Sequence, residues 1–461
     1  MNTIGIIAEY NPFHKGHAHQ LEGLRQKYPE ATLLVVMSGD FVQRGTPAIF
    51  SKFHRAQWAV MGGADIVFEL PSMFAVSSAE YFASSGVRLL HALGCDAISF
   101  GANHTQVEEL VSIAKALDYP STQESLRTLL GQGYSYGTAL RKAVQGLHLE
   151  INGLETSNHM SILDSDPNTI LGIEYIRALH RYHIGLDIIP VKRTSSHHNP
   201  TLDDSFPSGT ALRSAIYASK QTASNPLESH NTQQATSTTC SPCTPSEIDR
   251  AISLGELAIN GTTSLGKTSP QWHHYLPPMV APLAMDIVES NYYTNLERYY
   301  DKIHFASRVS SKEDLQTLQD MSDGLEEAWL TASALASWEQ ARESLKSKRY
   351  TYARLDRIAT YSLFRRTKKM FQECHQQGPT YGRLLAFNDR GRHYLKEKRA
   401  SIPVVQKWAP FCQQATGITK VLCEQDQLAS RLWRLAVDNP RYRDSHYDYT
   451  TSTIYVQQGE E

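Results

Sequence analysis

The chain has 461 residues, a formal net charge of −2, 41% apolar and 20% charged residues, values typical of a globular protein with two or three domains. It contains no run of eighteen apolar residues, and Glu9 interrupts the apolar N-terminus, so we predict neither a membrane span nor a signal peptide. The six cysteines are too scattered for a disulfide framework, which favours a reducing cytoplasm. Cys240 and Cys243 have C-x2-C spacing but no second pair, so no metal site is predicted.

The first predicted strand and the first predicted helix flank a loop that carries two histidines. Residues 4–7 form a short apolar run, and Pro12 marks a turn after it. A helical pattern begins after Gly16, so the free N–H groups of its first turn favour an anion in the loop. The imidazoles of His14 and His17 can stabilise charge on a phosphate. This arrangement favours chemistry at a phosphate, and two surface histidines at a turn are the alternative.

Short apolar runs and helical segments alternate over residues 1–217. The apolar runs cover residues 32–37, 66–70, 97–100 and 186–191, and the helical segments cover 53–61, 80–93, 107–117 and 170–180. Such alternation is typical of βαβ units and a parallel sheet, with ligands at the carboxyl ends of the strands. Asp40 lies three residues after the end of the apolar run 32–37, where it could bind Mg2+, orient a substrate or cap the loop.

A change of composition separates this part from the rest of the chain. Residues 218–247 are rich in Ser, Thr, Gln and Asn, which predicts a flexible insertion or linker. Residues 248–461 are predicted to form a mainly helical C-terminal domain. Its segment 346–369 reads KSKRYTYARLDRIATYSLFRRTKK, with an apolar stripe and a basic stripe at helical spacing.

The basic stripe of this segment suits the phosphates of an RNA. Its candidate RNA-binding residues are Arg349, Arg354, Arg357, Arg365 and Lys368. Tyr350, Tyr352 or Tyr361 could stack on an unpaired base. A solvated basic helix face is the alternative.

Further motifs follow the first loop along the chain. They are SGDFVQRGTPA (38–48), GADIVFELP (63–71), SAEYFA (78–83), SFGAN (99–103), NTILGIEY (168–175), PVKR (190–193), SGTALR (208–213) and KRYTYARLDR (348–357). Together with GIIAEYNPFHKGH (5–17), they resemble the tRNA(Met) cytidine acetate ligase family of the H-x-G-H nucleotidyltransferase superfamily. The resemblance extends over most of the chain.

The resemblance implies a fold and a set of site residues. The fold is a Rossmann-like, HUP-type parallel α/β domain followed by the mainly helical domain. The implied ATP-binding residues are Ile7, Ala8, Glu9, Tyr10, Asn11, Pro12, Phe13, His14, Lys15, Gly16, His17, Ala18, His19, Gln20, Gly101, Asn168, Arg193, Ser208, Thr210 and Arg213. The candidate catalytic residues are His14, His17, Asp40 and Lys52, with Gln43 and Arg44 as further candidates near Asp40.

The resemblance also implies a reaction. ATP activates acetate as acetyl-adenylate, and the acetyl group passes to N4 of the wobble cytidine of elongator tRNA(Met), which gives N4-acetylcytidine. The assignment of acetate and cytidine as substrates rests on the resemblance alone. Mg2+ is expected to accompany ATP. No obligatory protein partner is indicated. Thr194–His198 stands where the family commonly has a Gly-Tyr pair, which affects the contacts expected for the base.

Two other functions fit parts of the sequence. An adenylyltransferase acting on a small phosphorylated metabolite would explain the N-terminal loop but not the basic segment. A non-catalytic RNA-binding protein with a nucleotide fold would explain the basic segment but not the retained His14, His17 and Arg213.

Overall fold

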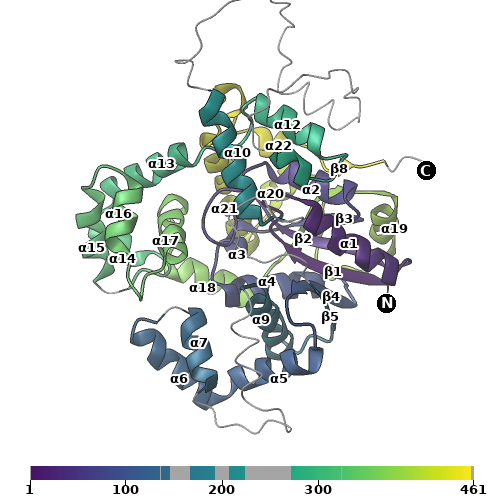
Figure 1. Cartoon of the computed structure of the whole chain (residues 1–461), viewed down its shortest axis with the longest axis horizontal. Coiled ribbons are helices and arrows are strands. Elements are labelled where there is room, and N and C mark those ends of the chain that lie inside the picture. Colours follow the sequence, from purple (N-terminus) through teal and green to yellow (C-terminus); the bar gives the residue numbers. More distant parts are fainter. Residues whose placement is uncertain are drawn as a thin grey trace, which may run out of the picture.

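A single mixed sheet runs through the protein, with strand order β5-β4-β1-β2-β3-β6-β7 and with β8 paired to β6 (Figure 1). This computed structural model describes residues 2–134, 136–145, 167–192, 207–223, 271–322 and 324–457. The strands are β1 (Thr3–Ala8), β2 (Thr32–Ser38), β3 (Ile66–Leu70), β4 (Ala97–Ala102), β5 (Asp187–Lys192), β6 (Gly382–Phe387), β7 (Val404–Val405) and β8 (Ile454–Tyr455). Strands β1 to β5 are mutually parallel, as the alternation of apolar and helical segments predicts.

The four helical segments predicted in the N-terminal half are present as helices, and the structure adds helices over residues 72–75, 120–131 and 136–145 that the sequence did not predict. The helices of this half are α1 (Lys15–Lys27), α2 (Lys52–Met61), α3 (Ser72–Ala75), α4 (Ala79–Ala92), α5 (Val107–Asp118), α6 (Pro120–Gly131), α7 (Tyr136–Gln145), α9 (Pro167–Arg181) and α10 (Gly209–Ala223). Successive residues of a strand face opposite sides of the sheet, so Leu33 and Val35 of β2 join one core and Leu34 and Val36 join the other. Helices α1, α2 and α10 pack on the first core, and α4, α5 and α9 pack on the second.

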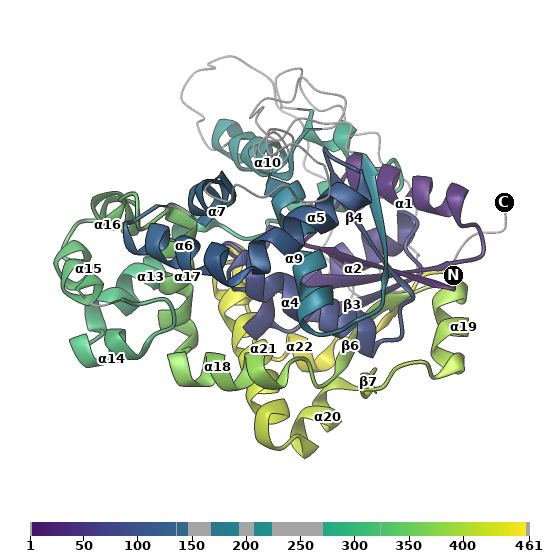
Figure 2. The same ribbon diagram turned by 90° about the horizontal axis from the view of Figure 1, so that it is seen from below.

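The C-terminal half is mainly helical. Its elements are η1 (Trp272–Tyr275), α12 (Ala281–Glu289), α13 (Leu296–Val309), α14 (Lys312–Thr317), α15 (Leu325–Ser333), α16 (Trp338–Leu345), α17 (Tyr352–Phe364), α18 (Lys368–Gln377), α19 (Asp389–Glu397), α20 (Trp408–Gln414), α21 (Gly417–Leu435), η2 (Pro440–Tyr442) and α22 (Tyr447–Thr450). Helices α13 to α17, here called the helical lobe, lie at one end of the molecule, away from α1 and α19 (Figures 1 and 2). In the described ranges, no helix is long and apolar enough to cross a bilayer.

The sheet itself crosses the boundary expected at residue 217. Strand β6 pairs antiparallel with β3, and β7 and β8 both pair with β6. The apolar run Leu384–Ala386 is buried in this sheet, so the C-terminal half contributes one edge of the same sheet. The prediction of a linker over 218–247 is wrong for residues 218–223, because they continue helix α10, and the rest of the expected linker lies outside the described residues.

Close packing of α9 on β4 gives a testable effect on stability. A Cβ built on Gly172 would lie 2.3 Å from the Phe100 ring, so Gly172→Ala is expected to cost about 1–3 kcal/mol through overpacking. Gly131→Ala is the matched control, because a Cβ there meets nothing within 4 Å. Denaturant midpoints of the two variants check this, and equal midpoints would contradict it.

Candidate active site

A cleft of about 420 Å³ lies where β1 and β4 end at their carboxyl termini. Its walls come from the start of α1, the loop after β2, α7, α9 and α10. This is the edge at which a parallel sheet of this kind binds ligands. The cleft is therefore the candidate active site.

The two histidines of the H-x-G-H motif stack at the start of α1, with ring centroids 3.7 Å apart and planes at 25°. His14 is the N-cap, and its Nδ1 accepts from the Gly16 N–H at 3.1 Å. His17 Nδ1 accepts from the His14 N–H at 3.3 Å. A neutral imidazole whose Nδ1 is an acceptor carries its proton on Nε2. The capping geometry thus assigns a Nε2–H donor to both rings, which both line the cleft.

Helix α10 brings a guanidinium to the cleft. Ser208 Oγ accepts from the Ala211 N–H at 3.2 Å and caps the helix. Arg213 Nη1 donates to the Asn11 carbonyl at 2.6 Å and Nη2 donates to Thr210 Oγ1 at 3.1 Å. Burial lowers the pKa of Arg213, and the nearby Glu9 opposes that shift. The guanidinium is thereby held against the loop that carries the histidines.

Most of the predicted ATP-binding residues meet in this cleft. Those that line it are Ile7, Ala8, Glu9, Tyr10, Asn11, His14, His17, Gln20, Gly101, Asn168, Ser208, Thr210 and Arg213. Gln20 Nε2 is buried and makes no hydrogen bond to any described residue, so it is a donor positioned for a ligand. Arg193 lies outside the described residues.

The remaining predicted residues support the loop instead of lining the cleft. Those that do not line it are Pro12, Phe13, Lys15, Gly16, Ala18 and His19. Phe13 is fully buried in the core, and Lys15 and His19 are exposed on the outer side of α1. A continuous motif necessarily includes such residues, because a helix turns every 3.6 residues.

Two lining residues lie outside the motifs quoted above. Tyr136 and Gly137 line the cleft from α7. The Tyr136 hydroxyl donates to Glu174 Oε1 at 2.7 Å and accepts from Arg177 Nη1 at 3.1 Å. Neither Tyr136 nor Gly137 belongs to a spacing pattern that sequence reasoning could have used, because α7 reaches the site only through tertiary packing.

Comparison with known proteins agrees with this geometry. A family model described as HIGH Nucleotidyl Transferase matches residues 1–448. Named tRNA(Met) cytidine acetate ligases from Syntrophomonas wolfei and Acetivibrio thermocellus are each 30% identical to this chain. The alignments cover 98% and 99% of this chain and 99% and 100% of those relatives. The chain belongs to the tRNA(Met) cytidine acetate ligase family.

The fold of this family member has a solved counterpart. The crystal structure of Thermotoga maritima TmcAL bound with alpha-thio ATP matches with a TM-score of 0.81 at 23% identity, over 99% of this chain and 100% of that one. An apo crystal form of the same protein also matches with a TM-score of 0.81, at 24% identity. The expected Rossmann-like fold and mainly helical C-terminal part are confirmed.

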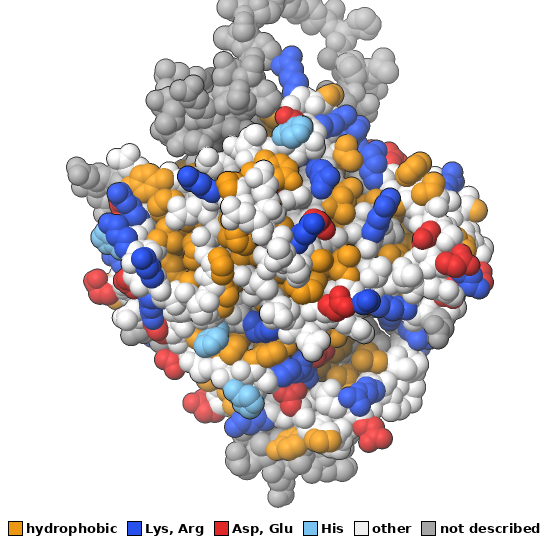
Figure 3. Space-filling view, turned by 180° about the vertical axis from the view of Figure 1, so that it is seen from behind, with side chains coloured by type: hydrophobic (Ala, Val, Ile, Leu, Met, Phe, Trp, Pro, Cys, Tyr) orange, Lys and Arg blue, Asp and Glu red, His pale blue; other side chains and the backbone are white. Residues whose placement is uncertain are grey.

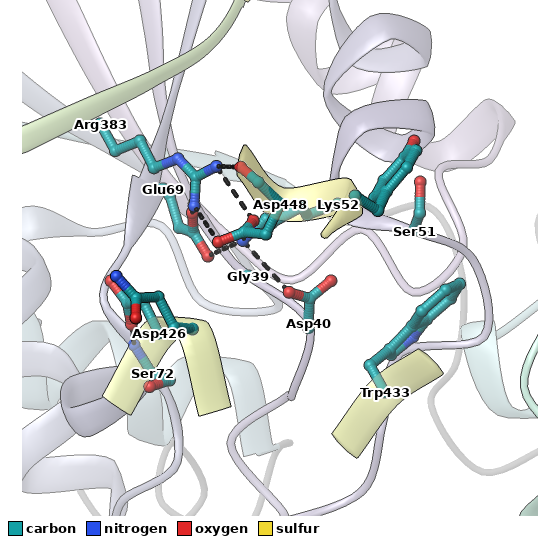
Figure 4. Close-up of polar contacts among 12 residues, drawn as sticks. Gly39, Asp40, Ser51, Lys52, Glu69, Ser72, Arg383, Asp426, Trp433 and Asp448 are labelled. Carbon is teal, nitrogen blue, oxygen red and sulfur yellow. Dashed lines mark hydrogen bonds and ion pairs between the residues drawn. The ribbon is translucent and has the colours of Figure 1, made fainter. Parts of the chain in front are cut away.

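Asp40 and Lys52 do not line the cleft of this ligase-family protein. Lys52 Nζ is fully buried and lies 3.1 Å from Asp40 Oδ2, 3.0 Å from Glu69 Oε1 and 2.7 Å from Asp448 Oδ1 (Figure 4). Arg383 also pairs with Glu69 and with Asp448, at 3.2 and 3.0 Å. We call these five residues the charged cluster, and it ties the loop after β2 to the C-terminal half.

Burial and pairing act in opposite directions within the charged cluster. Burial raises the pKa of Glu69 to about 7, although Lys52 and Arg383 act to lower it. Burial also acts to raise the pKa of Asp448, but Arg383 and Lys52 outweigh it and hold that pKa below its ordinary value. The three carboxylates keep the pKa of Lys52 above its ordinary value despite burial and the adjacent Arg383. The amine is therefore a fixed cation between carboxylates.

The basic segment forms α17, the loop before it and the start of α18. Arg349, Arg365 and Lys368 are exposed, whereas Arg354 Nη2 donates to the Asp320 carbonyl and Arg357 Nε lies 3.7 Å from Asp320 Oδ2. Tyr361 is fully buried, with its hydroxyl donating to the Val76 carbonyl at 3.1 Å. A stacking role for Tyr361 is therefore wrong, because its ring belongs to the core, while Tyr352 remains 37% exposed.

Helix α17 also contacts the loop that lines the cleft. The Gly45 carbonyl accepts from the hydroxyls of Tyr299 and Thr360. Gly45 has φ +85°, and a Cβ there would lie 2.7 Å from the Asp356 carbonyl oxygen, so only glycine fits. Its neighbours Arg44 and Thr46 line the cleft. The active-site loop and the basic helix are thus in direct contact.

Proposed function

We propose that this protein activates acetate with ATP and acetylates N4 of the wobble cytidine of elongator tRNA(Met), forming N4-acetylcytidine. The observation that carries the proposal is the stacked pair His14 and His17, whose Nε2–H donors lie with Arg213 in one cleft. Family membership supports it, because relatives of this length are named for that activity. A tRNA substrate is consistent with a cytoplasmic location.

The first step needs charge stabilisation and no protein nucleophile. An acetate oxygen attacks the α-phosphate in line, pyrophosphate leaves, and acetyl-adenylate remains. Negative charge shifts onto phosphate oxygens during the displacement, where the Nε2–H groups of His14 and His17 can donate. Arg213 would hold phosphates from the start of helix α10.

Mg2+ remains a prediction from the sequence. Asp40 does not fit as its ligand, because its carboxylate is buried against Lys52. The described residues contain no group of three His, Cys, Asp or Glu that could hold a metal ion. Mg2+ commonly binds through substrate phosphates and water with few protein ligands, so the ion would accompany ATP and contribute charge neutralisation there.

The direct test is incubation of the protein with ATP, labelled acetate and total tRNA, followed by digestion of the tRNA to nucleosides. We expect label in N4-acetylcytidine and equal amounts of AMP. Pyrophosphate release without labelled tRNA would favour an adenylyltransferase acting on a small metabolite. A protein that does not turn over ATP would favour a non-catalytic RNA-binding role.

The exposed cations of the basic segment are proposed to bind the tRNA backbone. Arg365→Ala is expected to weaken binding of every tRNA to a similar extent. It should also reduce the slope of the logarithm of the association constant against the logarithm of the salt concentration by about 1. Arg392→Ala on α19 is the matched control, because that arginine is exposed at the other end of the molecule. The measurement is tRNA affinity between about 50 and 200 mM salt, and an unchanged slope would contradict the assignment.

Local cations matter here because the face seen in Figure 3 carries mixed charges. Figure 3 shows Lys and Arg side chains spread among Asp, Glu and apolar side chains over one face. The formal net charge is only −2, so RNA binding depends on clustered residues and not on overall charge.

A further inference from the structure

Glu9 is the one carboxylate that lines the cleft within the described part of the chain, beside His14, His17, Arg44 and Arg213. The substrates of the first step, ATP and acetate, are anions, and a carboxylate near them raises their energy by Coulomb repulsion. A cation-lined cleft would bind them better without it. Glu9 therefore suits a partner that donates hydrogen bonds.

The surrounding structure fixes one oxygen of Glu9. The residue follows the last residue of β1, and its carbonyl accepts from Arg55 Nη1 at 2.6 Å. Its Oε1 accepts from the Gln43 N–H at 2.8 Å, while Oε2 makes no hydrogen bond to a described residue. A held carboxylate with its second oxygen available is an acceptor oriented before any ligand arrives.

The amino acceptor of the second step has the matching chemistry. The N4 amine of cytosine is a hydrogen-bond donor, and Glu or Asp is its usual protein acceptor. We infer that Glu9 accepts a hydrogen bond from the N4 amine of the acceptor cytosine and takes its proton during acetyl transfer. This inference rests on the proposed function.

The step balances in atoms and charge. The N4 lone pair attacks the acetyl carbonyl carbon, a carbon–nitrogen bond forms, and the bond from that carbon to the phosphate oxygen breaks. AMP leaves with the electron pair, one N4 proton passes to the Glu9 carboxylate, and Glu9 later releases it to water. A positioned general base of this kind contributes about 10²–10⁴-fold to a rate.

The experiment compares two acceptors of the same acetyl group. Hydroxylamine attacks acetyl-adenylate without help and gives acetohydroxamate and AMP, whereas cytidine in tRNA needs the base. Glu9→Gln is expected to lower N4-acetylcytidine formation about 10²–10⁴-fold more than it lowers acetohydroxamate formation. Glu9→Asp, which restores a carboxylate, is expected to recover part of the transfer rate. Glu22→Gln is the control, since Glu22 is an exposed carboxylate on α1 outside the cleft.

The outcomes separate this inference from the proposed function. Equal losses of both products in Glu9→Gln would overturn the role of Glu9 in transfer. Rescue of Glu9→Gln by excess Mg2+ would also overturn it and identify a metal ligand. A wild-type protein that forms acetohydroxamate but no N4-acetylcytidine would overturn the proposed function and this inference together.

Discussion

His14→Asn is expected to lower acetate-dependent pyrophosphate exchange by about 10²–10³-fold, which is the usual effect of losing one preorganised donor to a developing negative charge. Asparagine is a preferred N-cap residue, so its side-chain oxygen can still accept from the Gly16 N–H. The substitution therefore removes the Nε2–H donor and keeps the cap of α1. Exchange of labelled pyrophosphate into ATP measures the effect directly.

A stability measurement and a control variant distinguish an effect on the chemistry from an effect on the fold. The thermal midpoint of His14→Asn should stay close to that of the wild-type protein, because the cap is conserved. His91→Asn is the matched control, since His91 is exposed in the last turn of α4, outside the cleft. A His14→Asn protein with normal exchange would show that His17 and Arg213 suffice for activation.

Lys52→Met is expected to destabilise the protein by about 3–5 kcal/mol, the usual cost of removing one partner from a buried ion pair. The side chain is 1% exposed and is the only cation of the described structure that contacts Asp40. Methionine retains most of the volume of lysine, so the loss comes from charge and not from a cavity. The midpoint of urea unfolding measures it.

Lys52→Met also tests the catalytic role that the sequence suggested. Lys52 and Asp40 lie outside the cleft, so any loss of exchange should follow the loss of folded protein. A variant with the wild-type unfolding midpoint and no exchange would instead support a catalytic lysine. Lys420→Met is the control, because Lys420 is exposed on α21 and only weakly paired with Glu424.

Local patterns predicted the elements that hold the phosphate-binding loop. The apolar run in residues 4–7 and the helical pattern after Gly16 depend on neighbours in the sequence, and both appear as β1 and α1. The motif predicts an ATP contact for Phe13 and His19, but the Phe13 side chain is buried in the core and the His19 side chain is exposed to solvent. Motif membership identifies a segment and not the direction of each side chain.

Long-range partners explain what the sequence did not reveal. Lys52 is buried because Asp448, almost four hundred residues later, pairs with it at 2.7 Å. Tyr361 is buried because its hydroxyl reaches the Val76 carbonyl, although its spacing placed it with the basic side chains. Strand β6 joins β3 through backbone pairing that no local pattern encodes. Each of these depends on chain segments that meet only in the folded state.

The loop between Asp40 and Thr46 is held at two points, by the charged cluster and by the hydroxyls of α13 and α17 on the Gly45 carbonyl. An RNA bound at the proposed basic segment would therefore act on the same backbone that donates the Gln43 N–H to Glu9. Two ligands whose binding is coupled change each other's affinity by the same factor. Any gain in tRNA affinity caused by ATP must be matched by an equal gain in ATP affinity caused by tRNA.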